Sequence, residues 1–176
     1  RIKSWLEEYD KVTIRENSGI KIASELGIHA EQVLDPTFLL DKNEWEKLIP
    51  NRKCDEKYVL VYQLHPNKQF DAYAKEFAKR KGLKLYRVSH CFHHIVRSGK
   101  FICCPPLGEF LWYIKNAEYF LTDSFHGTAF SIGLNTQFVD VLPKSYSERI
   151  SSILELIGYE NRILKSYDCL LYTSPS

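Results

Sequence analysis

The 176-residue sequence has no long apolar segment and no marked excess of charge of either sign. A membrane-spanning helix needs about 20 consecutive apolar residues, and no run approaches that length. The N-terminus has no signal-peptide pattern. The 24 basic and 22 acidic residues are dispersed along the chain and give a net charge of +2. We therefore expect no transmembrane segment and no nucleic acid or anionic lipid as a partner.

Methionine is absent, and cysteine and glycine do not occur in the spacings of common sites. A chain without an initiator methionine that opens inside a helical pattern is expected to be a piece of a larger protein. The five cysteines form an odd, irregularly spaced set, which predicts reduced thiols and a cytoplasmic setting. The eight glycines form neither G-x-G-x-x-G nor a Walker A sequence, so no conventional dinucleotide or P-loop site is expected.

The sequence does contain a regular alternation of short apolar runs with amphipathic segments. Strands are predicted at residues 12–15, 32–34, 58–62, 83–88, 119–121 and 137–141. Helices are predicted around residues 2–9, 18–26, 42–49, 70–81, 109–116, 125–134 and 148–157. A β-hairpin is predicted from residues 92–96 to residues 101–103. Alternating strands and helices with short connections predict an α/β fold, with a mainly parallel sheet and helices on both faces.

The charged segment at residues 51–57 is the best candidate for a linker. It separates residues 1–50 from a domain at residues 58–162, in which the strand–helix rhythm repeats. Residues 163–176 are weakly patterned and are expected to form a tail, of which residues 171–176 lack any periodicity.

The most informative stretch, at residues 118–135, runs from a short strand through a polar turn into a helix. Ser124 lies at the helix cap, His126 in the first helical turn, and Gly127 where the helix packs. Unpaired backbone N–H groups and the helix dipole favour a bound anion at such a position. His126 is therefore the first candidate for a functional residue. The alternative is that Ser124 is only a cap, Gly127 only permits close packing and His126 is structural.

Two basic residues follow other predicted strands. Arg15 ends the first strand, where its guanidinium can clamp a carboxylate or phosphate; the alternative is a local ion pair with Glu16. Lys144 lies in the loop after residues 137–141, where a solvated lysine is the default. Because ligands of open α/β sheets bind outside the carboxyl ends of the strands, the turn at residues 122–126 lies at the expected edge.

Histidine and cysteine gather between residues 90 and 106, but without the paired cysteines of a common zinc site. Cys91, His93 and His94 precede Cys103 and Cys104 across the predicted hairpin. No C-x-x-C spacing is present, and adjacent histidines on a strand point to opposite faces. No metal is therefore expected.

Four segments in order resemble motifs of the polysaccharide pyruvyl transferase family. They are Val12–Glu16 with the Ser-Gly pair that follows, Val33–Thr37 with Leu39–Asp41, Glu109–Ala117, and Thr122–Ser131. The resemblance extends from about Thr13 to Arg162 and corresponds to the later part of proteins that have two Rossmann-like domains, in the manner of GT-B glycosyltransferases. It implies that residues 1–50 are the tail end of the N-terminal Rossmann-like domain and the crossover. Residues 58–162 would then be the C-terminal Rossmann-like donor-binding domain.

The resemblance implies transfer of a pyruvyl unit from phosphoenolpyruvate to a sugar of a surface polysaccharide, as a ketal. The acceptor would be a polysaccharide or a lipid-linked oligosaccharide, and no cofactor is implied beyond the donor substrate. His126 matches the family's donor-binding histidine and is the candidate catalytic acid, with Ser124 and Gly127 beside it. Arg15 matches a donor-binding arginine, and Lys144 a basic residue in a variable loop. The isolated fragment is expected to be inactive.

Two other functions stay open. A GT-B glycosyltransferase that uses a nucleotide sugar would share the fold, although the loop from Pro143 to Ser147 offers no glutamate for a nucleotide ribose. A non-catalytic polysaccharide-binding module would need exposed rows of aromatic side chains. Most of the aromatic residues instead fall at predicted core positions.

Overall fold

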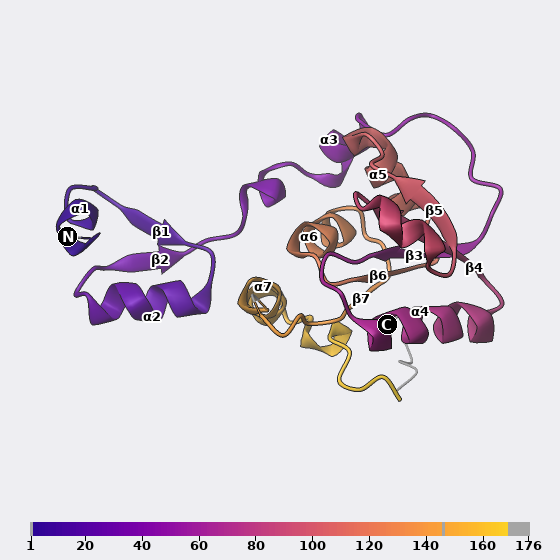
Figure 1. Ribbon diagram of the computed structural model, residues 1–176. Coiled ribbons are helices and arrows are strands. Elements are labelled where there is room, and N and C mark those ends of the chain that lie inside the picture. The colour runs from indigo at the N-terminus through magenta and orange to yellow at the C-terminus, as the bar shows by residue number, and fades with distance from the viewer. Residues whose placement is uncertain (1, 146, 169–176) are drawn as a thin grey trace.

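The computed structural model describes residues 2–145 and 147–168, which form a small N-terminal unit and a larger C-terminal unit (Figure 1). The N-terminal unit contains α1 (Ile2–Leu6), β1 (Val12–Ile14), α2 (Asn17–Glu25) and β2 (Ala30–Gln32). The strands of the C-terminal unit are β3 (Tyr58–Tyr62), β4 (Lys84–Ser89), β5 (Lys100–Cys103), β6 (Tyr119–Thr122) and β7 (Phe138–Asp140). Its α-helices are α3 (Lys42–Glu46), α4 (Lys68–Lys81), α5 (Leu107–Lys115), α6 (Phe125–Gly133) and α7 (Glu148–Ile157). Its 3₁₀ helices are η1 (Pro36–Leu39), η2 (Phe92–Val96) and η3 (Glu160–Arg162).

The large sheet has the strand order β5-β4-β3-β6-β7, and every neighbouring pair is parallel. β3 is the first of these strands in the chain and lies at the centre. The chain adds β4 and β5 on one side, then crosses over and adds β6 and β7 on the other. This is the order of a Rossmann-like sheet. The predicted α/β class and the Rossmann-like, mainly parallel sheet are confirmed.

Helices cover both faces of this sheet, as the side chains of β3 show. Tyr58 and Leu60 pack with residues of α5, α6 and α7. Val59 and Val61 pack with residues of α4 on the opposite face, and Figure 1 shows α4 across the sheet from α5 and α6. All four side chains are fully buried. A strand that is buried on both faces has no polar alternation, which explains the continuous apolar run in the sequence.

In α4, local sequence and packing agree. The Asn67 side chain accepts hydrogen bonds from the backbone N–H groups of Gln69 and Phe70, both at 3.1 Å. At the other end Gly82 adopts a left-handed conformation with φ of 67°, which ends the helix. Full burial of a phenylalanine such as Phe70 stabilises the fold by about 1.5–3 kcal/mol. The buried face of α4 consists of Phe70, Tyr73, Ala74, Phe77 and Ala78.

The predicted hairpin between residues 92–96 and 101–103 is wrong. Residues 92–96 form the 3₁₀ helix η2, and β5 pairs in parallel with β4. The apolar side chains of Phe92, Ile95 and Val96 are exposed rather than paired in a sheet. A short apolar run does not by itself distinguish a strand from a helical turn. In a strand, neighbouring side chains alternate between two faces, whereas in a 3₁₀ turn they do not. Adjacent side chains of residues 92–96 are therefore not directed to opposite faces.

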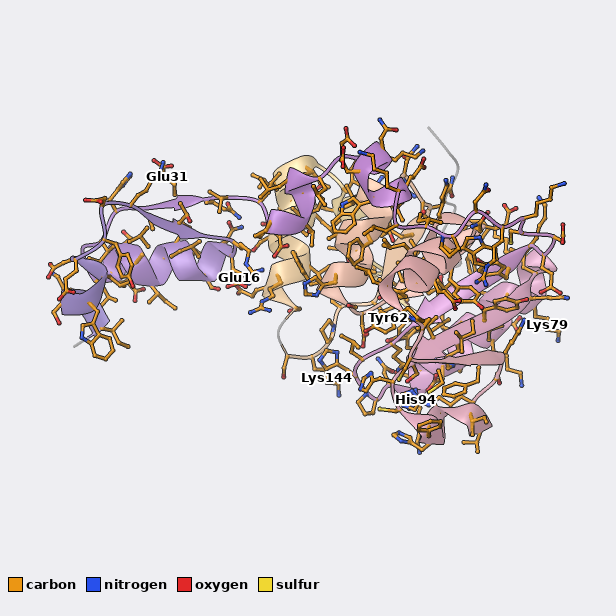
Figure 2. All side chains as sticks on the ribbon, turned by 90° about the horizontal axis from the view of Figure 1, so that it is seen from above. Glu16, Glu31, Tyr62, Lys79, His94 and Lys144 are labelled. Atoms are coloured by element: carbon orange, nitrogen blue, oxygen red, sulfur yellow. The ribbon has the colours of Figure 1, made fainter. Side chains whose placement is uncertain are left out.

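The N-terminal unit is a small β-α-β arrangement in which β1 and β2 pair in parallel. Ala23 of α2 is buried, but its neighbour Ile22 is 57% exposed. A two-stranded sheet is too narrow to cover the whole apolar face of α2. The unit touches α7 through the Glu16–Arg149 ion pair at 2.6 Å, and Figure 2 shows Glu16 at the end of the unit that faces the C-terminal unit.

Residues 36–57 form the first part of the C-terminal unit and pack against its core. The Asp41 side chain caps α3 by accepting the backbone N–H of Glu44 at 2.9 Å. The rings of Trp45 and Phe130 meet edge to face at 5.1 Å. Residues 51–57, the predicted linker, have no regular secondary structure.

Residues 163–168, at the start of the predicted tail, return to the sheet. Ile163 forms a parallel bridge with Asp140 of β7. The Tyr167 hydroxyl accepts a hydrogen bond from the Asn67 side chain at 2.8 Å. This short segment therefore adds to the cover over α4 and β7.

Within residues 2–145 and 147–168, no helix has both the length and the hydrophobicity needed to cross a membrane. The cysteines described there are free thiols, as predicted: Cys54, Cys91, Cys103 and Cys104. The predictions for Cys169 and for residues 171–176 concern residues outside the described ranges.

Candidate functional site

A pocket of about 410 Å³ opens at the carboxyl edge of the large sheet. Its walls come from the loop between β3 and α4, the turn between β6 and α6, and the loop that follows β7. The chain leaves β3 toward α4 on one face and leaves β6 toward α6 on the other, so these two connections diverge. In open α/β sheets, such a reversal of strand order creates the crevice in which ligands bind. The pocket is therefore the leading candidate for a functional site.

His65 and Asp123 face each other across this reversal. The Asp123 carboxylate is 4% exposed and accepts the backbone N–H groups of Leu64 at 2.6 Å and of His65 at 2.9 Å. Its Oδ2 also lies 3.1 Å from Nδ1 of His65. The His65 side chain is 44% exposed and lines the pocket.

This contact determines which nitrogen of His65 is available. An ionised carboxylate only accepts hydrogen bonds, so Asp123 selects the form of His65 that carries its proton on Nδ1. The Nε2 lone pair is then free to accept a proton. A histidine oriented by a buried carboxylate at the wall of a pocket has the geometry of a general base.

Polar groups from the neighbouring elements complete the wall. Lys144 and Ser145 come from the loop after β7, and Lys68 comes from the first turn of α4. Asn67 lines the pocket while it caps α4. The positive end of the α4 dipole and the two lysines favour an anionic ligand here. Lys144, a predicted substrate-binding residue, therefore shares a pocket with His65. Figure 2 shows Lys144 along the same edge of the C-terminal unit as His94.

Behind the pocket, β7 ends in a second buried carboxyl group. Asp140 is fully buried, and its Oδ1 accepts a hydrogen bond from the Thr128 hydroxyl at 2.7 Å. Burial raises the pKa of Asp140 to about 8; the Thr128 hydrogen bond lowers it, and the charge of Asp123 raises it further. The Asp140 carboxyl is therefore largely protonated at neutral pH.

Arg15 lies just beyond β1 and pairs with Asp35 rather than with Glu16. Asp35 is buried and also accepts the backbone N–H of Thr37 at 3.0 Å. Burial alone raises the pKa of Asp35, but the Thr37 hydrogen bond and the Arg15 guanidinium together hold the pKa below its usual value. The Arg15 guanidinium carbon lies 6.0 Å from the centroid of the Phe125 ring, so Arg15 reaches the start of α6.

His126 follows Phe125 in the first turn of α6 and is exposed to solvent. The two rings lie 5.5 Å apart. Because Arg15 approaches the same phenylalanine, the structure brings Arg15 and His126 to the same end of α6. Among the described residues that line the pocket, this turn contributes Asp123, whereas Arg15 and His126 lie outside the lining.

Ser124 and Gly127 shape the turn itself. The buried Ser124 hydroxyl accepts the backbone N–H of Gly127 at 3.3 Å and so caps α6. A Cβ on Gly127 would lie 2.7 Å from the Thr122 hydroxyl oxygen, so only glycine fits without a shift. Both residues have a structural role here, and their contact with a substrate stays a prediction.

The described residues bring together one group of at least three potential metal ligands, which lies outside this pocket. It consists of Cys91, His93 and His94, at the carboxyl end of β4.

His65 and Asp123 are the functional candidates that sequence analysis misses. Asp123 has the appearance of an ordinary cap residue, and His65 lies in an unpatterned loop. The only sequence signal for His65 was its position relative to a predicted strand. His65 follows the end of the central strand by three residues, at the edge where the turn after β6 also lies.

Comparisons with known proteins bear on the family of this chain. The sequence model described as "Polysaccharide pyruvyl transferase" matches residues 1–146. A search of curated proteins found none that matches the sequence significantly.

Two solved structures have a partial likeness to the fold. One is the UDP-GlcNAc 2-epimerase from Neisseria meningitidis bound to UDP-GlcNAc, with 15% identity and a TM-score of 0.45 over 69% of this chain and 34% of that chain. The other is the dodecameric iron-containing heptosyltransferase TibC in complex with ADP-D-beta-D-heptose, with 16% identity and a TM-score of 0.44 over 70% of this chain and 34% of that chain. The matched region spans about a third of the length of each.

Proposed function

Since this chain belongs to the polysaccharide pyruvyl transferase family, we propose that it is part of an enzyme that transfers pyruvyl from phosphoenolpyruvate to sugar hydroxyls of a surface polysaccharide, forming a ketal. The proposal rests chiefly on the oriented His65–Asp123 pair, which faces the same pocket as Lys144. A base, an acid and cations are what this reaction requires.

The chemistry sets those requirements. The CH₂ carbon of phosphoenolpyruvate gains a proton, and the cation that develops at the neighbouring carbon is trapped by one sugar hydroxyl. Phosphate then leaves, and a second hydroxyl of the acceptor closes the ketal. One of the two hydroxyl protons replaces the proton given to the CH₂ carbon, and the other leaves with inorganic phosphate. The enzyme has to move these protons and neutralise the donor's carboxylate and phosphate.

His65 is suited to the base step. With Nδ1 bonded to Asp123, its Nε2 can take the proton from an acceptor hydroxyl as that oxygen attacks. The imidazolium that forms is stabilised by the Asp123 carboxylate. Both groups are fixed by backbone hydrogen bonds of the same loop, so little reorganisation accompanies the step.

The donor site is assigned to the start of α6 and the adjoining pocket. His126 is the candidate acid for the CH₂ carbon, and Arg15 the clamp for the donor carboxylate or phosphate. Lys144, in the loop after β7, lines the adjoining pocket and supplies a second cation. Ser124 and Gly127 hold the turn that presents His126. The approach of both Arg15 and His126 to Phe125 supports this grouping.

The chain would supply the carboxyl-terminal portion of a GT-B-like enzyme of two Rossmann-like domains. The N-terminal unit exposes Ile2, Tyr9 and Ile22, which supports its belonging to a larger packed domain. Such an enzyme closes its site between two domains. We therefore expect the isolated chain to form no ketal.

The remaining parts of the proposal concern partners and setting. The acceptor is a polysaccharide or a lipid-linked oligosaccharide, and phosphoenolpyruvate serves as donor substrate without a further cofactor. A cytoplasmic setting fits the free thiols.

Calorimetry on the full-length protein tests the function directly. Phosphoenolpyruvate should bind, and nucleotide sugars should not. Incubation with a sugar acceptor should then release phosphate and give a product whose mass has increased by one pyruvyl unit. Binding of a nucleotide sugar alone would favour a glycosyltransferase, and binding of polysaccharide without any turnover would favour a non-catalytic module.

A further inference from the structure

The segment after β4 combines an exposed apolar surface with an inward-facing histidine. In η2, Phe92 is 74% exposed and Val96 is 86% exposed, whereas His94 is 6% exposed. Burial of apolar side chains therefore does not hold η2 in place. The side chain that faces inward is a potential metal ligand.

Two further potential ligands lie beside His94. The ligand atoms of Cys91, His93 and His94 all lie within 4.8 Å of one another. These residues are near neighbours in sequence, and the helical turn brings their side chains together. The sequence-based objection, that adjacent histidines diverge on a strand, does not apply because residues 92–96 are not a strand.

Ser89, at the end of β4, contacts two of these three residues. Its buried hydroxyl oxygen accepts the backbone N–H of Cys91 at 3.0 Å and lies 2.8 Å from Nδ1 of His94. When Nδ1 carries the proton, it donates to Ser89 and leaves Nε2 free to bind a cation. Metal-binding histidines have just such a partner on the ring nitrogen that does not bind the metal.

We propose that Cys91, His93 and His94 bind a zinc ion. One thiolate and two imidazoles form a donor set that suits Zn²⁺, whereas Mg²⁺ and Ca²⁺ require oxygen ligands. Zinc bonds of about 2.0–2.3 Å place tetrahedral ligands roughly 3.3–3.7 Å apart, so the cluster has to tighten by only about 1 Å. A water molecule would complete the coordination, and the Cys91 thiol would release its proton to solvent on binding.

The charges around this site are partly balanced. Arg87 and Arg97 lie nearby, and both pair with Asp71, at 2.9 and 3.3 Å. The Gln63 side chain oxygen also accepts a hydrogen bond from each guanidinium, at 3.1 and 3.0 Å. The Cys91 thiolate would add the negative charge that a bound cation requires.

A bound zinc would fix η2 against the end of β4. Arg97, which follows η2, bonds to Gln63, and the Gln63 amide donates to the backbone oxygen of His65 at 2.8 Å. The site would therefore be linked to the pocket through Arg97 and Gln63 without lining it. The proposal does not depend on pyruvyl transfer, because it concerns a different set of residues.

The test uses the 176-residue chain after treatment with a chelator, with Zn²⁺ alone and Co²⁺ alone as probes. Calorimetry should show one Zn²⁺ per chain. Co²⁺ should give a thiolate-to-metal charge-transfer band and the visible absorption of a tetrahedral site. Absence of the thiolate band in the wild-type chain overturns the proposal.

Variants identify the ligands. Cys91→Ser should abolish the thiolate band, and His93→Gln should weaken Zn²⁺ binding by at least the roughly 10- to 100-fold that loss of an outer partner costs. His90→Gln, an exposed histidine next to the cluster, and Cys54→Ser should leave both readouts unchanged. A thiolate band that persists in Cys91→Ser contradicts the assignment. Because His93 is exposed, its variant tests the site even if Cys91→Ser folds poorly.

Ser89→Ala tests whether the hydrogen bond between Ser89 and His94 contributes to Zn²⁺ affinity. It should retain the thiolate band but weaken Zn²⁺ binding by about 10- to 100-fold, since His94 loses the partner of Nδ1. Unchanged affinity would contradict the role of Ser89 in the proposed site.

Discussion

The Nδ1 atom of His65 lies 3.1 Å from Oδ2 of Asp123, and the same carboxylate accepts two backbone N–H groups of the β3–α4 loop. One buried side chain from the end of β6 thus fixes both the path of the loop and the orientation of the imidazole. It does so across the point where the strand order reverses. The shape of the pocket and its candidate base depend on a single residue.

We expect His65→Gln to lower pyruvyl transfer by the full-length protein by ~10²-fold or more, because it removes the acceptor for the hydroxyl proton. The measurement is phosphate release from phosphoenolpyruvate in the presence of acceptor. The partly exposed side chain should be replaceable without unfolding the protein. His29→Gln, an exposed histidine of the N-terminal unit, is the matched control. Equal activity of both variants would remove His65 from the mechanism.

Asp123→Asn should lower the turnover by a similar factor. An amide can present an N–H to the imidazole, and it then favours the wrong tautomer of His65. Residues that act as one unit are not additive, so the double variant with His65→Gln should be no slower than either single variant. Multiplied losses in the double variant would show that the two residues act independently.

Much of the fold could be predicted because its signals are local. The apolar run Tyr58–Tyr62, the stripe of α4 and the cap at Ser124 each follow from a few neighbouring residues. Parallel order then follows from the strand–helix rhythm. The strand predicted at residues 92–96 was wrong because these residues form a 3₁₀ turn with exposed apolar side chains. In sequence, such a turn resembles a short strand.

The candidate site was harder to predict because it is assembled across the sheet. His65 and Asp123 are 58 residues apart, and neither belongs to a spacing that indicates a dyad. Only the pairing of β3 with β6 brings them together. Arg15 and its partner Asp35 show the same limit, since the sequence suggested the adjacent Glu16 instead.

His126→Ala should lower pyruvyl transfer by ~10²-fold or more if His126 acts as the acid. Turnover and calorimetry on the full-length variant measure the effect. Wild-type activity with unaltered donor affinity in His126→Ala would assign His126 a structural role.

Arg15→Lys should chiefly weaken phosphoenolpyruvate binding, because lysine keeps the charge but loses the bidentate fork. Calorimetry on the full-length variant measures the donor affinity, and turnover measures the chemical step.

Gly127→Ala should destabilise the chain by about 1–3 kcal/mol, as expected for an overpacked site. Its Cβ would lie 2.7 Å from the Thr122 hydroxyl oxygen and 3.2 Å from atoms of the Phe120 ring. Gly133→Ala in the same helix is the control, because its Cβ would lie 3.8 Å from Trp45 and should stabilise by up to about 1 kcal/mol. Urea unfolding measures both changes, and the same sign for both would contradict the packing argument.

Asp140 should make the stability of the chain depend on pH in an unusual direction for a carboxyl group. Its pKa is about 8 in the folded protein, against 3.8 for an unperturbed aspartate. Between these values the folded chain keeps a proton that the unfolded chain releases, so the contribution is fully present below about pH 4 and is lost as the pH rises through 8. Asp140→Asn keeps an oxygen for the Thr128 hydroxyl and cannot titrate.

The difference in unfolding free energy between wild type and Asp140→Asn isolates this effect, because the other titrating groups are common to both chains. From pH 5.5 to 8.5 the wild type should lose about 3 kcal/mol relative to the variant, since each pKa unit corresponds to about 1.4 kcal/mol. Urea unfolding at the two pH values measures it. Parallel pH profiles would mean that Asp140 is already ionised in the folded chain. Its carboxylate would then need a hydrogen-bond donor for Oδ2, which has no partner among the described residues.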